Sequence, residues 1–151
     1  MGQYFEFVKN DTITVEGHIL HRIRCTRDCK WAKKGELGGY IEEFENLCDD
    51  AWVSDDARVY GDAWVSGNAQ VSGDARIDCI KAHCGFDVFG SCGRHTHAYI
   101  TAENKIEITC GCFRGSIEEF EAKVRRTHGD NQYAHEYLAI IYLIKIKFGL
   151  V

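Results

Sequence analysis

The middle of the chain repeats itself every six residues, and this period restricts the fold more than any other feature of the sequence. Branched aliphatic residues recur six positions apart without a slip, at Ile41, Leu47, Val53, Val59, Val65, Val71 and Ile77. Alanine stands two residues before each of the last five, and Gly or Asp stands two residues after five of the seven. A helix needs apolar residues three and four apart, and a flat strand pair alternates every two residues, so neither explains this period.

A small residue, an aliphatic residue and a turn residue in each hexad are typical of a left-handed parallel β-helix, in which a hexad forms one short strand and one corner. Three hexads close one coil, so we expect residues eighteen apart to stack, with Ile41 over Val59 and Val59 over Ile77. The repeat itself carries no reactive side chain. So short a stack of hexads needs caps, and we expect partners as well.

The two flanks differ from the repeat in their patterns. Residues 1–40 alternate around a turn and predict an N-terminal β cap, residues 41–78 form the β-helix, and residues 79–151 form a C-terminal β-hairpin and two helices. The predicted fold class is therefore mainly β with α: a short left-handed parallel β-helix flanked by an N-terminal β-hairpin and a C-terminal β-hairpin plus two helices.

The helix boundaries in the C-terminal flank are clear. Ser116 and Glu119 form a capping box, and Gly129 ends the first helix. Asp130 caps a second helix that runs to about Lys147 and is apolar on most sides. We expect the domain or another subunit to bury that helix.

Composition excludes several classes of function. The net charge of -5 argues against non-specific binding of nucleic acid, which needs a basic surface. The most apolar stretch, residues 138–146, is too short to span a bilayer, and we find no secretory signal, so we expect a cytoplasmic protein. The eight cysteines are then reduced thiols rather than a disulfide framework.

The chain resembles hexapeptide-repeat proteins encoded by phages and prophages. The resemblance rests on "HILHRIRCTRDCKWAKKGELGGYIEEFENL", on the Asp-Ala-x-Val-x-Gly hexads, and on "ITCGCFRGSIEEFEAKVRRTHGDNQYAHEYLAIIYLIK". Relatives often have a Gly-Ser-Arg stretch after the coil, and the resemblance implies that Arg94 in "GSCGRHTHAY" matches its arginine, while the histidines depart from the pattern. The resemblance implies a protein that binds a host target in the infected or lysogenic bacterium, such as an immune protein or its nucleotide signal.

A zinc site is one candidate. If the C-terminal hairpin turns symmetrically about Glu103-Asn104, the histidines of "HTH" face cysteines on the next strand. The candidate ligands are His95, His97, Cys110 and Cys112. A three-residue loop would destroy this register, and we favour core packing for these thiols. Cys79, His83, Cys84 and Cys92 fit no familiar zinc spacing, and we interpret them as structural.

An anion or nucleotide pocket is the second candidate. Charged side chains would supply hydrogen bonds to phosphate, glycines would allow close approach, and Phe113 would stack on a base. The candidate residues are Arg94, His95, His97, Gly111, Phe113, Arg114, His128 and Gly129. The structural alternative is that Arg114 is solvated, His128 favourably ends a helix and Gly129 is only a C-cap.

Trp52 and Trp64 precede axial residues of the repeat, so we expect both to point outward, where they form a protein-contact surface or cover an edge. Many left-handed β-helix proteins are acyltransferases, but the hexads from 50 to 77 lack the histidine base that such enzymes use. We therefore expect a non-enzymatic homo-oligomer that sequesters a host component and antagonises host antiviral defence. A zinc-binding structural protein and an acyltransferase-like enzyme are the alternatives.

Overall fold

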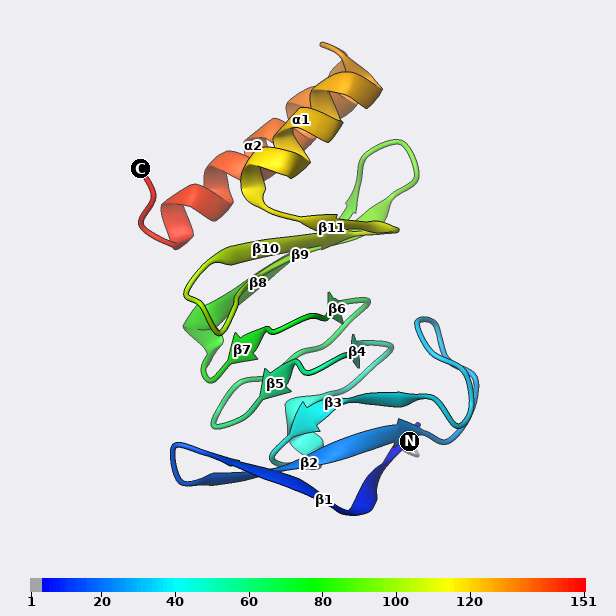
Figure 1. Ribbon diagram of the computed structural model, residues 1–151. Coiled ribbons are helices and arrows are strands. Elements are labelled where there is room, and N and C mark those ends of the chain that lie inside the picture. The colour runs from blue at the N-terminus through cyan, green and yellow to red at the C-terminus, as the bar shows by residue number, and fades with distance from the viewer. Residues whose placement is uncertain (1–3) are drawn as a thin grey trace.

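The computed structural model describes residues 4–151 and shows three layers stacked along one axis (Figure 1). At one end lie β1 (Phe5–Val15), β2 (His18–Cys25) and β3 (Leu37–Ile41). The hexads form the middle layer with the two-residue strands β4 (Trp52–Val53), β5 (Arg58–Val59), β6 (Gln70–Val71) and β7 (Arg76–Ile77). The other end holds a sheet and two helices (Figure 1).

The first layer continues into the repeat through hydrogen bonds. The five-stranded sheet has the order β1-β2-β3-β5-β7, in which β1, β2 and β3 are antiparallel and β3, β5 and β7 are parallel. Strand β4 pairs in parallel with β6 in a separate two-stranded sheet. Short 3-10 turns, η1 (Phe44–Asn46) and η2 (Ile80–Ala82), lie at the start and after the end of the hexads.

The last layer is an antiparallel sheet of four strands with the order β11-β10-β9-β8. Its strands are β8 (His83–Phe89), β9 (Arg94–Ile100), β10 (Ile106–Cys110) and β11 (Phe113–Gly115). Helices α1 (Ile117–His128) and α2 (Gln132–Lys147) cover the face that turns away from the repeat (Figure 1). Because strand side chains alternate, Ala98 faces these helices while Tyr99 belongs to the core of the repeat.

The predicted fold class, a mainly β protein built on a left-handed parallel β-helix between hairpins, is wrong. The protein is a mixed α/β molecule whose larger sheets are antiparallel or mixed. The prediction fails because each hexad contributes at most two residues of strand, and because the hydrogen bonding of the repeat continues into antiparallel strands. The C-terminal flank is likewise a four-stranded sheet rather than a hairpin.

The pairs of residues eighteen positions apart are nevertheless confirmed. Ile41 bridges Val59, Val59 bridges Ile77, and the same parallel pairing joins Leu47 to Val65. All these aliphatic side chains are buried. The glycines that follow Val59, Val65 and Val71 adopt a positive φ of 64–65°, which explains the preference for glycine at these corners.

The two tryptophans of the repeat lie in different surroundings. Trp64 is exposed as predicted, but Trp52 is buried, so the prediction that both point outward is wrong for Trp52. The ring of Trp52 packs 6.3 Å from the ring of Tyr4, centroid to centroid. The N-terminal strands therefore cover this side of the repeat. For Trp52 this agrees with the alternative prediction that the tryptophans cover an edge of the repeat.

Candidate functional site

A cavity among the described residues lies between the four-stranded sheet and the two helices. It has a volume of about 140 Å³. Its walls come from the β8–β9 loop, the start of β9, the end of β10, the start of β11, one face of α1 and a tyrosine of α2. The lining residues are Ser91, Cys92, Arg94, Cys110, Phe113, Phe120, Lys123, Val124, Thr127, His128 and Tyr137.

The ends of the helices fix the position of this cavity. Ser116 accepts a hydrogen bond from the backbone N–H of Glu119, and the Glu119 side chain accepts one from the N–H of Ser116, which confirms the predicted capping box. Gly129 ends α1 at a φ of 64°. The cap of α2 is Asn131, whose side chain accepts from the N–H of Ala134, and not Asp130 as predicted. These signals produce a tight turn that brings the end of α1 beside the start of α2.

The rim of the cavity is cationic. Arg94 and Lys123 are exposed and His128 is half-buried. Within residues 4–151, no carboxylate lies within ion-pair distance of any of these three side chains. Gly111 allows Arg94 to approach the β10–β11 turn, because a Cβ at Gly111 would collide with the guanidinium. The rim therefore offers hydrogen-bond donors and positive charge to an anion.

The floor of the cavity is aromatic. Phe113 and Phe120 lie 5.1 Å apart by ring centroids, and Phe120 meets Tyr137 edge-on at 5.5 Å. His128 stacks on Tyr137 at 5.8 Å with an interplanar angle of 25°. Burial raises the pKa of Tyr137, so its hydroxyl stays protonated. A flat ring entering the cavity would meet aromatic faces and edges on several sides.

The structure brings together three of the predicted pocket residues: Arg94, Phe113 and His128. Gly111 supports Arg94 from behind, whereas Gly129 is a C-cap with open space around its α-carbon. Lys123 and Tyr137 line the cavity but were not among the predicted residues. Lys123 stands four positions before Thr127 on one face of α1, so helical periodicity is the signal that would have found it.

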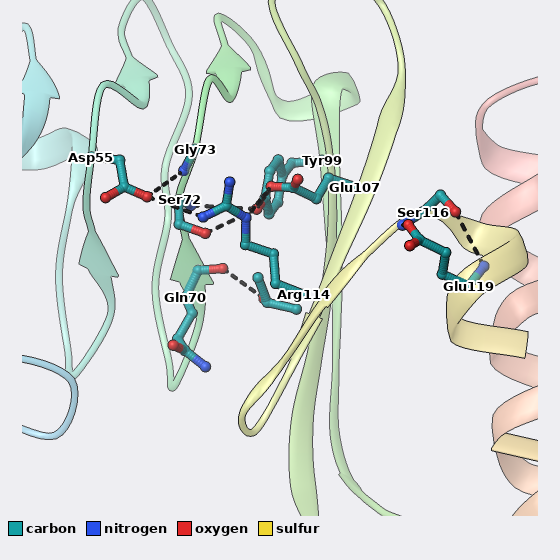
Figure 2. A network of polar contacts seen from close by, with 10 residues as sticks. Asp55, Gln70, Ser72, Gly73, Tyr99, Glu107, Arg114, Ser116 and Glu119 are labelled. Carbon is teal, nitrogen blue, oxygen red and sulfur yellow. Dashed lines mark hydrogen bonds and ion pairs between the residues drawn. The ribbon is translucent and has the colours of Figure 1, made fainter. Parts of the chain in front are cut away.

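Arg114 points to the other side of the sheet, away from the cavity (Figure 2). Its guanidinium pairs with Asp55 of the repeat at 3.1 Å and with Glu107 of β10 at 3.3 Å. Glu107 also accepts a hydrogen bond from the hydroxyl of Tyr99, which lies 3.4 Å from the Ser72 hydroxyl. Arg114 is therefore not a cavity residue: its side chain is 48% exposed, and its ion pair with Asp55 links the sheet to the repeat.

The predicted histidine–cysteine zinc arrangement does not form. His97 pairs with Thr109, and Cys110 pairs with Thr96, so the register differs by one residue from a symmetric turn. His97 therefore faces the repeat and Cys110 faces the helices, while Cys112 is exposed in the next turn. In the part of the chain that the structure describes, no three His, Cys, Asp or Glu side chains are placed to hold a metal ion.

Comparison with known proteins gives no family assignment. No protein-family model matches the sequence, and no curated protein matches it either. None of the helices within residues 4–151 is both long enough and apolar enough to cross a membrane.

Proposed function

We propose that the protein is a binding protein that takes a small aromatic anion, of the mononucleotide type, in the cavity between the sheet and the helices. The observation that carries this proposal is the combination of an unpaired cationic rim, formed by Arg94, Lys123 and His128, with an aromatic floor. Phosphate is recognised by charge-assisted hydrogen bonds, and bases are recognised by stacking.

The size of the cavity favours one ring over a larger ligand. A dry cavity of about 150 Å³ holds a molecule of benzene, and the present cavity measures about 140 Å³. A single pyrimidine-like ring fits inside, with the phosphate outside against Arg94 and Lys123. A dinucleotide would leave its second base in solvent.

The biological role follows from the resemblance to phage and prophage proteins. We propose that the protein acts in the cytoplasm of the bacterial host without chemical catalysis, and that it sequesters a nucleotide signal of the antiviral defence.

Isothermal titration calorimetry with mononucleotides tests the binding. We expect a pyrimidine mononucleotide to bind, and inorganic phosphate and the matching nucleoside to bind more weakly. Arg94→Ala should weaken binding by about 10- to 100-fold, as the loss of a charge-assisted hydrogen bond does. Arg126→Ala is the matched control, because Arg126 is an exposed arginine of α1 that does not line the cavity. Failure of every mononucleotide to bind, or equal loss in both variants, would contradict the proposal.

Trp64 favours a second candidate, a contact with a host protein. Its side chain is 59% exposed, and its indole N–H donates to the Cys48 sulfur at 2.7 Å, which fixes the ring. It borders a groove whose charged residues are Glu43, Glu45 and Asp62. An acidic groove beside a fixed tryptophan suits a basic side chain of a partner. Trp64→Ala should then abolish co-purification of a host protein, while nucleotide binding stays unchanged.

A homo-oligomer is supported by the outer face of α2 and the residues after it. Large apolar side chains remain exposed there, namely Tyr142, Leu143, Ile146, Leu150 and Val151. Several large exposed apolar side chains near one another in the sequence are typical of an interaction site. Native mass spectrometry of the gently purified protein measures the subunit number and detects a bound ligand in the same experiment. Leu143→Glu should convert an oligomer to a monomer.

A further inference from the structure

Three histidines and one aspartate form an unbroken hydrogen-bonded chain on the face of the sheet that turns toward the repeat. His95 Nδ1 lies 2.6 Å from Asp87 Oδ1, His95 Nε2 lies 2.9 Å from His97 Nδ1, and His97 Nε2 lies 2.8 Å from His83 Nδ1. We call these four residues the histidine relay. None of them belongs to the cavity.

Backbone geometry holds the rings together. In the pairing of β8 with β9, Gly85 lies opposite His97, and a Cβ at Gly85 would lie 2.7 Å from His97 Nδ1 and 2.8 Å from His95 Nε2. Only glycine leaves room here for two stacked imidazoles. His97 is 4% exposed and the side chain of His95 is 7% exposed, so protein atoms and not water satisfy their ring nitrogens.

The carboxylate sets the direction of every hydrogen bond in the relay. Asp87 as a carboxylate can only accept, so His95 donates through Nδ1–H and has an unprotonated Nε2. That nitrogen accepts from His97 Nδ1–H, and His97 Nε2 accepts in turn from His83 Nδ1–H. All three neutral rings therefore carry their proton on Nδ1, and the free lone pair is at His83 Nε2.

We propose that the histidine relay binds one proton as a unit, taking it up at His83 and holding the resulting charge on His95 beside Asp87. A hydronium ion of the solvent gives a proton to His83 Nε2, where an N–H bond forms, and becomes water. The proton on His83 Nδ1 then passes to His97 Nε2, and the proton on His97 Nδ1 passes to His95 Nε2. One proton enters and none leaves, so His95 becomes an imidazolium while the other two rings stay neutral with their protons on Nε2.

The surroundings explain why the charge moves to His95. Burial and the neighbouring histidines hold the pKa of His97 well below its usual value. Burial and the nearby Lys147 of α2 lower the pKa of His83 to about 4. At the other end of the relay, His95 pairs with the carboxylate of Asp87 on β8. Gly67 of the repeat lies near this carboxylate. The relay thus separates the ring where the proton enters from the ring that can carry its charge.

The position of the relay gives this uptake a consequence for the molecule. His95 follows Arg94 of the cavity rim directly in β9, and the relay lies between the sheet and the repeat. Protonation adds one positive charge at this junction and reverses the proton positions of two buried rings. The relay is therefore a pH-sensitive device, and it does not depend on the ligand proposed above.

Nitrogen-15 NMR of the imidazole rings tests the relay directly. At pH 8 we expect all three rings to be protonated on Nδ1. As the pH falls, His83 and His97 should switch to Nε2–H while His95 becomes doubly protonated, all with one common midpoint. Asp87→Asn should lower that midpoint by about one pH unit, because the stabilising charge is lost. Asp74→Asn is the control, since Asp74 is an exposed aspartate of the repeat.

Three outcomes would overturn the proposal: separate midpoints for the three histidines, Nε2–H on His97 at pH 8, or an unchanged midpoint in Asp87→Asn. Zinc added as a probe would overturn it too if the ring nitrogens shifted at one equivalent, because the cluster would then be a metal site. His97→Gln gives a further check, since an amide can hydrogen-bond but cannot pass a proton. His83 and His95 should titrate separately in that variant. If His97→Gln does not fold, the midpoint of Asp87→Asn tests the relay in its place.

Discussion

The repeat and the C-terminal sheet are neighbouring layers that differ in how many polar side chains they bury. Inside the repeat the axial positions are aliphatic and fully buried, as at Val53 and Val71. In the sheet, polar groups are buried too: of the five buried polar residues among residues 4–151, four lie on or beside its strands, namely Thr96, His97, Thr101 and Thr109.

This difference shows that the periodic sequence provides a rigid support, while the irregular sequence provides the polar sites. A hexad that must fit above and below its neighbours has no space for a reactive group, so the repeat provides a rigid platform. Asn46, the buried polar residue at the first corner, uses its amide to donate to the carbonyls of Gly61 and Ala63, and it too is structural. The irregular sheet places unlike residues side by side, and both the cavity and the relay lie there.

The largest effect should come from a cavity in the repeat. Ile41→Ala removes a fully buried side chain that is stacked on Val59, and we expect a loss of about 2–5 kcal/mol in the free energy of unfolding. Ile80→Ala, at a position 62% exposed, should change it by less than about 0.5 kcal/mol. Urea unfolding measures both. A small loss for Ile41→Ala would show that the stability does not reside in the repeat.

The next largest effect should be the pH dependence of the free energy of unfolding that His83 of the sheet causes. His83 has a pKa near 4 in the folded chain and about 6.5 when unfolded, so the unfolded chain binds more protons between these values. Stability is therefore highest above pH 6.5 and falls as the pH is lowered toward 4, by up to about 3 kcal/mol from this residue.

Unfolding measured between pH 7 and 4.5 in the wild type and in His83→Asn isolates that contribution. Asparagine keeps a donor for His97 but does not titrate, so the pH dependence should become weaker. His135→Gln, at an exposed histidine, should leave it unchanged. Equal pH dependence in all three chains would mean that the buried rings do not control acid stability.

A smaller effect should come from the junction between the two layers. Tyr99→Phe removes the hydroxyl that donates to Glu107, and Arg114 keeps that carboxylate paired. We expect a loss of about 1–3 kcal/mol, the cost of a buried hydrogen bond. Tyr133→Phe, at a half-exposed position of α2, serves as the control in thermal unfolding. A loss no larger than that of the control would indicate that the Tyr99 hydroxyl does not stabilise this junction.

The sequence predicted what depends on local pattern. The parallel pairs follow from a strict period, and the capping box of α1 follows from two residues three apart. The fold class was wrong because the period says nothing about the strands that continue the sheet on either side. The predicted zinc arrangement does not form because the hairpin loop is one residue longer than expected. Thr101 N–H donates to the Lys105 carbonyl, so the loop has three residues, and the residues that face each other on the two strands shift by one.

The site was predictable in part. Arg94, Phe113 and His128 were chosen for their chemistry, and the cavity does bring them together. Tyr137 could not be placed from sequence, because its position depends on how α2 crosses the sheet. The relay was missed for the same reason, since His83 reaches His97 only through the pairing of β8 with β9. Chemistry that needs two strands in register depends on loop lengths that residue types do not determine.

The smallest effect tests the element that joins the cavity to the sheet. Ser116 caps α1 directly after β11, and its side chain and that of Glu119 satisfy each other's backbone N–H groups (Figure 2). Hydrogen bonds from the backbone N–H and the side chain of Ser116 lower the pKa of Glu119, which favours the ionised cap. Ser116→Ala should cost about 1 kcal/mol in the free energy of unfolding, whereas Ser91→Ala, in the exposed β8–β9 loop, should cost less. Lys123 and His128 of the cavity rim lie on α1, so we expect the affinity for the ligand to fall in Ser116→Ala. An unchanged affinity would show that the cavity does not depend on the capped end of this helix.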